Sequence, residues 1–293
     1  MLLKMQPTES APRFAMSIDV EDYFQVWAFS KVIDRASWDG FSPRVAAATR
    51  RALDLFDRTG TKATFFTLGW VAERHPELIR DIIGRGHELA SHGYDHAKVF
   101  DQTLDGFRED AGRTKSLLED IAGVEVIGYR APGFSIGGRT PWAHEVLAEL
   151  GYRYSSSAHP IAHDHYGDPN GERAPYSPVA GRAFVEAPVA TAEIFGRRIS
   201  CAGGGWFRAA PYAVSKRLID RACKSIGGPV IFYFHPWEVD PGQPRIRTAP
   251  LKSQLRHYIN LSRMEPKLER LLADYRWERV DEALGFTRAS TAA

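Results

Sequence analysis

Residues 86–96, with the sequence GHELASHGYDH, connect the fold of this chain to its chemistry. A Gly-Arg-Gly turn followed by apolar residues predicts a short strand over residues 86–90. His92 and His96 follow, four residues apart. On one helical turn this spacing separates the β-carbons by about 5–6 Å, which suits two imidazoles that bind one metal ion. The alternative is a pair of ordinary loop histidines, so the interpretation needs support from the rest of the chain.

Predicted strands and helices alternate through the first 155 residues. This alternation is typical of a parallel β/α architecture, in which functional residues gather at the carboxyl ends of the strands. Asp19, His92 and Arg130 all lie at the ends of predicted strands. The predicted strands are 14–20, 62–68, 86–90 and 124–129, and the predicted helices are 43–59 (with Ser42 as N-cap), 76–83, 101–121 and 140–150.

The second half of the chain is less regular. Residues 158–182 predict a long surface loop that could cover a substrate cleft, and its three histidines (His159, His163 and His165) are interpreted as surface residues. The run PVIFYF at 229–234 predicts a buried strand that delivers His235. Other predicted elements are a hairpin around Gly196 (184–189 with 193–199), helices at 212–226 and 251–274 with a kink or break at Pro266, and a last strand at 277–280.

The bulk composition is that of an ordinary globular protein. The chain has 293 residues, 44% hydrophobic and 25% charged, with a formal net charge of +2, which does not indicate a nucleic-acid partner. Its two cysteines do not make a disulfide framework. Neither a secretory signal nor a transmembrane segment is recognisable, so we expect a cytoplasmic protein. The expected organisation is one domain at 14–286 between tails at 1–13 and 287–293.

Three carboxylates lie within four residues at the end of the first long strand: Asp19, Glu21 and Asp22. An acid inside a buried strand is costly unless it is paired or bound to a metal ion. Three neighbouring carboxylates also repel one another, so a positive charge should lie nearby. The alternative is a solvated acidic loop.

Four motifs, in this order along the chain, give the sequence its resemblance to the polysaccharide deacetylase family (NodB homology, carbohydrate esterase family 4). They are SIDVED at 17–22, SHGYDH at 91–96, YRAPG at 129–133 and FHP at 234–236. The segments GGGWFR at 203–208 and HPWEVDP at 235–241 are similar to an extension of exosortase-associated exopolysaccharide deacetylases. The resemblance implies a distorted (β/α) barrel of about seven strands, with the extension beginning at about residue 158.

The resemblance also implies a reaction and the residues that perform it. The reaction is hydrolysis of an acetamide on an N-acetylated amino sugar, in a polysaccharide or its precursor, within exopolysaccharide biosynthesis. A divalent metal ion, by default Zn²⁺ although Co²⁺, Ni²⁺ or Mn²⁺ would also fit, would be bound by His92, His96 and one early acid. Asp19 would be the general base, His235 the general acid, and Arg130 the partner of Asp19.

Three points stay open in this assignment. The acidic ligand is either Glu21 or Asp22, and we favour Asp22 because its short side chain suits close coordination. Related enzymes often carry an acid, where this chain has Ser155, that orients the catalytic histidine. The residues expected to contact substrate are Pro132, Gly133, Phe134, Trp206 and Trp237, although core packing is an alternative for the tryptophans.

Two other functions compete with metal-dependent deacetylation. The first is a metal-independent cyclic-amide hydrolase of the allantoinase type, which the intact metal-ligand candidates disfavour. The second is a non-catalytic polysaccharide-binding protein, which the joint presence of base, acid and ligand candidates disfavours. The sequence does not indicate the oligomeric state.

Overall fold

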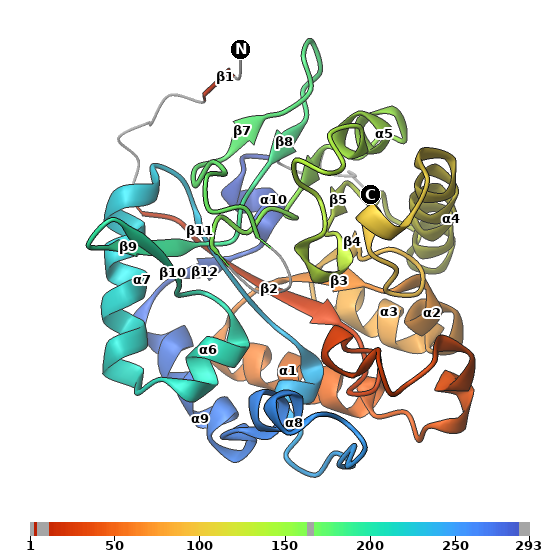
Figure 1. Cartoon of the computed structure of the whole chain (residues 1–293), viewed down its shortest axis with the longest axis vertical. Coiled ribbons are helices and arrows are strands. Elements are labelled where there is room, and N and C mark those ends of the chain that lie inside the picture. The colour runs from red at the N-terminus through yellow and green to blue at the C-terminus, as the bar shows by residue number, and fades with distance from the viewer. Residues whose placement is uncertain (1–2, 5–11, 163–166, 287–293) are drawn as a thin grey trace.

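The computed structural model describes residues 3–4, 12–162 and 167–286. Seven parallel strands form a curled sheet (Figure 1), in the order β8-β6-β5-β4-β3-β2-β11, and β12 also pairs with β2. The expected distorted β/α barrel is therefore confirmed. The strands are β2 (Phe14–Val20), β3 (Thr64–Thr67), β4 (Glu88–Ser91), β5 (Gly128–Tyr129), β6 (Tyr154–Ser155), β8 (Val185–Glu186), β11 (Val230–Phe234) and β12 (Trp277–Glu278).

Alternation along β2 divides its side chains between two environments. Phe14, Met16, Ile18 and Val20 belong to the large apolar core that also includes residues of α1 and α9. The intervening side chains face the inside of the curl, where Ala15 packs in a separate apolar cluster. Asp19 therefore lies on the inner side of the sheet at its carboxyl end.

Helices cover the outer face of the sheet (Figure 1). None of them, within the part of the chain that the structure describes, is long and apolar enough to cross a membrane. The helices are α1 (Val45–Thr59), α2 (Gly69–Arg74), α3 (Pro76–Gly84), α4 (Leu104–Ala122), α5 (Ala143–Glu149), α6 (Gly204–Ala209), α7 (Tyr212–Ile226), α8 (Leu251–Tyr258), α9 (Leu261–Asp274) and α10 (Val280–Ala283). Of these, α10 packs instead in the inner cluster that contains Ala15.

Short strands complete the edges. Within the expected tail 1–13, β1 (Leu3–Lys4) pairs antiparallel with β7 (Tyr176–Ser177), which joins β8. The hairpin around Gly196 is formed by β9 (Thr191–Ile194) and β10 (Arg197–Ser200). The predicted partner strand 184–189 instead contributes β8 to the main sheet. The expected tail 287–293, and His163 and His165, lie outside the described residues.

The long helix predicted at 251–274 is divided at a position other than the proline. The break falls at Asn260, which has a left-handed backbone with φ of 52°, whereas Pro266 lies inside α9. The buried Arg208 guanidinium donates to the carbonyl oxygens of His257 and Ile259. These carbonyls at the end of α8 would otherwise lack partners, so Arg208 stabilises the break.

Candidate active site

Four strands deliver polar side chains to the same edge of the sheet. Asp19 lies at the end of β2, His92 follows β4, Arg130 follows β5 and His235 follows β11. Because these strands are parallel, their carboxyl ends meet. Asp19, His92 and His235 line one groove with a volume of about 430 Å³. The structure thus brings these three predicted site residues together.

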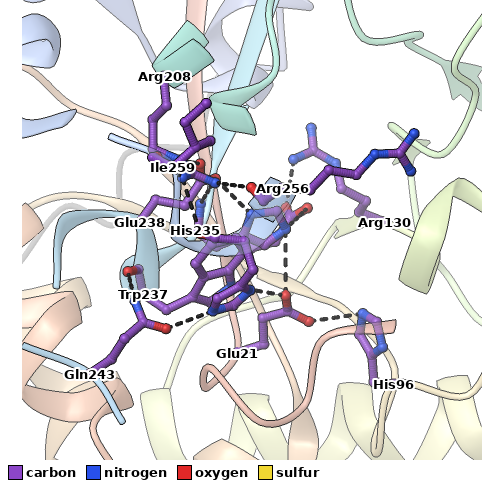
Figure 2. Close-up of polar contacts among 12 residues, drawn as sticks. Glu21, His96, Arg130, Arg208, His235, Trp237, Glu238, Gln243, Arg256 and Ile259 are labelled. Atoms are coloured by element: carbon purple, nitrogen blue, oxygen red, sulfur yellow. Dashed lines mark hydrogen bonds and ion pairs between the residues drawn. The ribbon is translucent and has the colours of Figure 1, made fainter. Parts of the chain in front are cut away.

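Glu21, His92 and His96 form a compact cluster in this groove. One potential ligand atom from each residue lies within 4.8 Å of the other two. The His96 Nε2 atom is 2.9 Å from Glu21 Oε2, and Figure 2 shows Glu21 between His96 and His235. Burial would raise the pKa of Glu21, but His96, His235 and His92 hold it at about 2. Glu21 is therefore a carboxylate at neutral pH.

His92 has the protonation state that a metal ligand needs. Its Nδ1 atom lies 2.7 Å from the carbonyl oxygen of Arg130, which can only accept a hydrogen bond. Nδ1 must then carry the proton, leaving the lone pair on Nε2. Burial lowers the pKa of His92 to about 4, so the ring is neutral.

The two histidines meet through a loop and not through the helical turn that their spacing suggested. Residues 92–98 form no helix. Gly93 and His96 have positive φ values of 71° and 61°, which are incompatible with a right-handed helix. Their ring centroids are 5.4 Å apart.

Asp22 does not join the cluster, so our preference for it over Glu21 is wrong in this geometry. Its carboxylate accepts hydrogen bonds from the backbone N–H groups of Tyr23, Arg44 and Val45. Asp22 thus caps α1, a role that the sequence prediction gave to Ser42, and the helix begins at Val45. The chain turns directly after β2, where the backbone N–H of Glu21 donates to the carbonyl oxygen of Asp19, and both carboxylates line the groove.

Arg130 pairs with Asp19, as predicted. The guanidinium is fully buried, and its Nη1 donates to Asp19 Oδ1 at 2.6 Å and to Ser17 Oγ at 2.9 Å. Nε and Nη2 donate to the backbone carbonyl and the hydroxyl of Ser156. All three nitrogen atoms of the Arg130 guanidinium donate hydrogen bonds, so the group is fixed and holds Oδ1 of Asp19 in place. The other oxygen, Oδ2, lies 4.0 Å from His235 Nε2.

Glu238 orients His235, a role for which the sequence analysis found no residue. Glu238 Oε1 accepts hydrogen bonds from the backbone N–H and from Nδ1 of His235, the latter at 2.9 Å. Its Oε2 accepts from Arg208 Nε at 2.6 Å (Figure 2), and both side chains are buried. Burial lowers the pKa of His235, but Glu21, Glu238 and Asp19 raise it to about 9. His235 is therefore protonated at neutral pH.

The signal for Glu238 was present in two motifs in which the sequence analysis assigned no role to Glu238 or Arg208. Glu238 is the last residue of HPWE, and Arg208 is the last residue of GGGWFR. A β-carbon on Gly204 would lie 2.2 Å from Glu238 Oε1, so this glycine makes room for the carboxylate. Ser155, where an orienting acid was expected, hydrogen-bonds to Ser157 instead.

The predicted substrate contacts divide into three groups. Gly133, Phe134 and Trp206 line the groove, and 52% of the Trp206 side chain is exposed. Pro132 is buried and does not line it. Trp237 lines it, but its ring is stacked on His235 on one side and on His257 on the other, with centroids 5.1 and 4.0 Å apart. Trp237 therefore offers no free face to a sugar and instead supports His235.

Catalytic groups of β/α barrels lie at the carboxyl ends of the strands, and this arrangement of acids and histidines defines such a site. Residues 37–155 match the family model for polysaccharide deacetylase, and residues 156–285 match a domain of unknown function, DUF3473. The chain therefore carries a polysaccharide deacetylase domain. The boundary between the two matches lies close to residue 158, where the extension was expected to begin.

Individual relatives agree with this assignment. The chain is 32% identical over 98 residues to a peptidoglycan-N-acetylglucosamine deacetylase of Bacillus cereus, and 30% identical over 107 residues to a peptidoglycan deacetylase of Helicobacter pylori. These matches cover 33% and 36% of this chain. The chain spans about a third of the length of these curated relatives, 36% in each case.

Solved structures share the fold over nearly the whole chain. A Mycobacterium smegmatis protein assigned to the polysaccharide deacetylases superimposes with a TM-score of 0.63 at 23% identity, covering 100% of this chain and 97% of that one. A carbohydrate esterase family 4 pseudoenzyme of Bacillus anthracis superimposes with a TM-score of 0.52 at 12% identity, covering 97% and 72%. The fold is thus shared by proteins described as enzymes and as a pseudoenzyme.

Neither family match contains the whole site. His92, His96 and Arg130 lie within residues 37–155, Asp19 and Glu21 precede this region, and His235 belongs to residues 156–285. Because β11 pairs with β2, the second region completes the sheet of the first. The site exists only where the parts of the chain meet.

Proposed function

We propose that this protein is a metal-dependent hydrolase that removes N-acetyl groups from an amino-sugar polysaccharide or its precursor, in exopolysaccharide biosynthesis. One observation carries the proposal: Asp19 and His235 lie beside the Glu21–His92–His96 cluster in a single groove. A base, an acid and a three-ligand cluster are the groups that amide hydrolysis requires. The cytoplasmic location expected from the sequence stays a prediction.

The cluster suits a divalent metal ion. One carboxylate and two imidazoles are a common ligand set of catalytic zinc sites, and Co²⁺, Ni²⁺ or Mn²⁺ can use the same donors. The carboxylate of Glu21 is ionised, and Nε2 of the neutral His92 carries a lone pair, so these donors are in the states that bind a cation. When bound, the ion would acidify a water molecule and polarise the amide carbonyl group.

Two side chains of the groove move protons. Asp19 takes the proton of the attacking water, because Arg130 holds its carboxylate in position through Oδ1. His235 donates a proton to the leaving amine from Nε2, since Nδ1 is engaged by Glu238. The backbone N–H of Phe134 is engaged, because it donates to the carbonyl oxygen of Ala131. The backbone N–H of Gly133 is therefore the candidate donor to the developing oxyanion.

The two alternatives make different demands on the site. A metal-independent cyclic-amide hydrolase would have no use for a carboxylate and two imidazoles that lie within 4.8 Å of one another. A non-catalytic binding protein would have no use for a buried Arg208–Glu238 pair directed at His235. Both observations favour the hydrolase.

Acetate release from N-acetylglucosamine oligomers, with and without a chelator, tests the proposal. We expect release by the purified full chain, loss with the chelator and recovery when Zn²⁺ or Co²⁺ is added back. Turnover of a cyclic amide that is indifferent to the chelator would establish the first alternative. Binding of the oligomers without acetate release under every metal condition would establish the second.

A further inference from the structure

Helix α8 exposes leucines beside the groove. Leu251 and Leu255 are four residues apart on this helix, and 82% and 72% of their surfaces are exposed. Leu255 and Trp206 of α6 both line the groove, so the exposed apolar side chains continue along its rim. α6 and α8 lie on the same side of the molecule in Figure 1. Isolated exposed leucines are ordinary, but a group at the mouth of a groove suggests an interaction surface.

The inner face of α8 already packs against the domain, so its exposed leucines are not part of an incomplete core. His257 is buried and contacts the rings of Trp237 and Phe29, with centroids 4.0 and 4.7 Å away. The Tyr258 hydroxyl accepts from the backbone N–H of Ile246 at 2.7 Å. The helix is thus fixed against the domain with its leucines turned outward.

The same segment is strongly basic. Residues 241–264 contain none of the 36 acidic residues of the chain. The five basic residues of this segment are all exposed: Arg245, Arg247, Lys252, Arg256 and Arg263. A chain with a net charge of only +2 therefore concentrates positive charge around the exposed leucines.

We propose that this face, which we call the basic-apolar surface (Trp206, Leu251, Leu255, Arg245, Arg247 and Lys252), docks on an anionic lipid bilayer. Leucine and tryptophan side chains enter the headgroup region, and basic side chains next to them attract anionic lipids. An acidic polymer would match the basic residues but not the leucines. A second copy of the chain is disfavoured because a two-fold contact would oppose like charges.

Docking in this way turns the mouth of the groove toward the bilayer. The rim residues Leu255 and Trp206 belong to both the groove and the basic-apolar surface. This part of the inference rests on the proposed function: the amino sugar would reach the site from the membrane, as a lipid-linked glycan. The lipid tail would stay in the bilayer while the sugar enters the groove.

Co-sedimentation of the full chain with vesicles tests the docking without using turnover. We expect binding to vesicles of equal parts phosphatidylglycerol and phosphatidylcholine, little binding to pure phosphatidylcholine, and weakening as salt rises. Arg247→Glu with Lys252→Glu should reduce binding at least about tenfold. Leu251→Ser with Leu255→Ser should also reduce binding, because it removes the apolar anchor.

Two matched variants separate this surface from general charge and apolarity. Arg217→Glu with Lys224→Glu makes the same charge change on exposed positions of α7, and Phe195→Ser removes an apolar side chain that is 99% exposed elsewhere. Both should bind vesicles like the parent chain. Equal losses in these controls, or no binding of the parent to anionic vesicles, would overturn the proposal, whatever the result of the acetate assay. If size-exclusion chromatography showed a dimeric parent and a monomeric leucine variant, the surface would be a contact between two copies and the proposal would also be overturned.

Discussion

Buried polar groups have different surroundings at the two ends of the same sheet. Strand β4 carries Glu88 at its start and is followed by His92 at its end. At the amino end, Glu88 accepts hydrogen bonds from Thr64, Tyr154 and the backbone N–H of Asp281, and Asp281 pairs with Arg279. At the carboxyl end, Glu21 and Asp19 face imidazoles in an open groove.

The comparison separates stability from chemistry. At the amino end, β12 and α10 close the sheet, and its polar groups satisfy one another inside the protein. At the carboxyl end, the groups are held in place but directed at a space that a ligand can enter. We therefore expect substitutions at the amino end to change the free energy of unfolding and substitutions at the carboxyl end to change turnover.

The largest expected effect is that of Asp19→Asn. Loss of the general base should lower kcat by about a thousandfold, within the range for such groups, while bound metal is retained. Acetate release and metal analysis on the same sample check this. Asp95→Asn is the matched control, because Asp95 pairs with Arg35 outside the cluster and should keep near-normal turnover. Near-normal turnover of Asp19→Asn would show that the base is assigned to the wrong residue.

Arg279→Met should produce the largest loss of stability. The substitution leaves the buried Asp281 without its charged partner, which costs about 3 kcal/mol or more. Urea unfolding measures this, and acetate release should stay within about twofold of the parent at a temperature where the variant is folded. Arg108→Met, at a pair with both side chains 41% exposed, should cost less than about 1 kcal/mol. Equal losses of unfolding free energy in the two variants would contradict the stabilising role assigned to the amino end of the sheet.

Glu238→Gln should have an intermediate effect on turnover. The amide oxygen can still accept from His235, but Arg208 loses its carboxylate, and His235 loses a charge that raises its pKa. We expect kcat to fall by about 10- to 100-fold, as for other groups that orient a catalytic residue, with metal content unchanged. A kcat equal to that of the parent would limit Glu238 to a structural role.

Glu88→Gln should have the smallest effect at neutral pH, and its effect on stability should depend on pH. Burial and the nearby Asp281 raise the pKa of Glu88 to about 8, above its ordinary value of 4.5. The folded state then binds more protons than the unfolded state between these values, so the free energy of unfolding falls as pH rises from about 4.5 to about 8. Urea titrations at several pH values should show a shallower fall in Glu88→Gln. Parallel curves for parent and variant would contradict this.

The sequence predicted the architecture better than the details of the site. Strong apolar runs located β2 and β11, because buried parallel strands need them. The positions of Asp19, His92, Arg130 and His235 followed from strand ends. The sequence did not decide which of Glu21 and Asp22 is the metal ligand, because their roles depend on where α1 lies relative to β2. Glu238 was missed because its contact with Arg208 joins two segments that no local pattern connects.

Metal content of matched variants at the two adjacent acids tests the central claim most directly. The claim is that Glu21, with His92 and His96, binds the catalytic ion, whereas Asp22 caps α1. Elemental analysis after equilibration with Zn²⁺ should find about one ion per chain in the parent and in Asp22→Asn, and a much smaller amount in Glu21→Gln. Retention of the ion by Glu21→Gln together with its loss from Asp22→Asn would contradict the account.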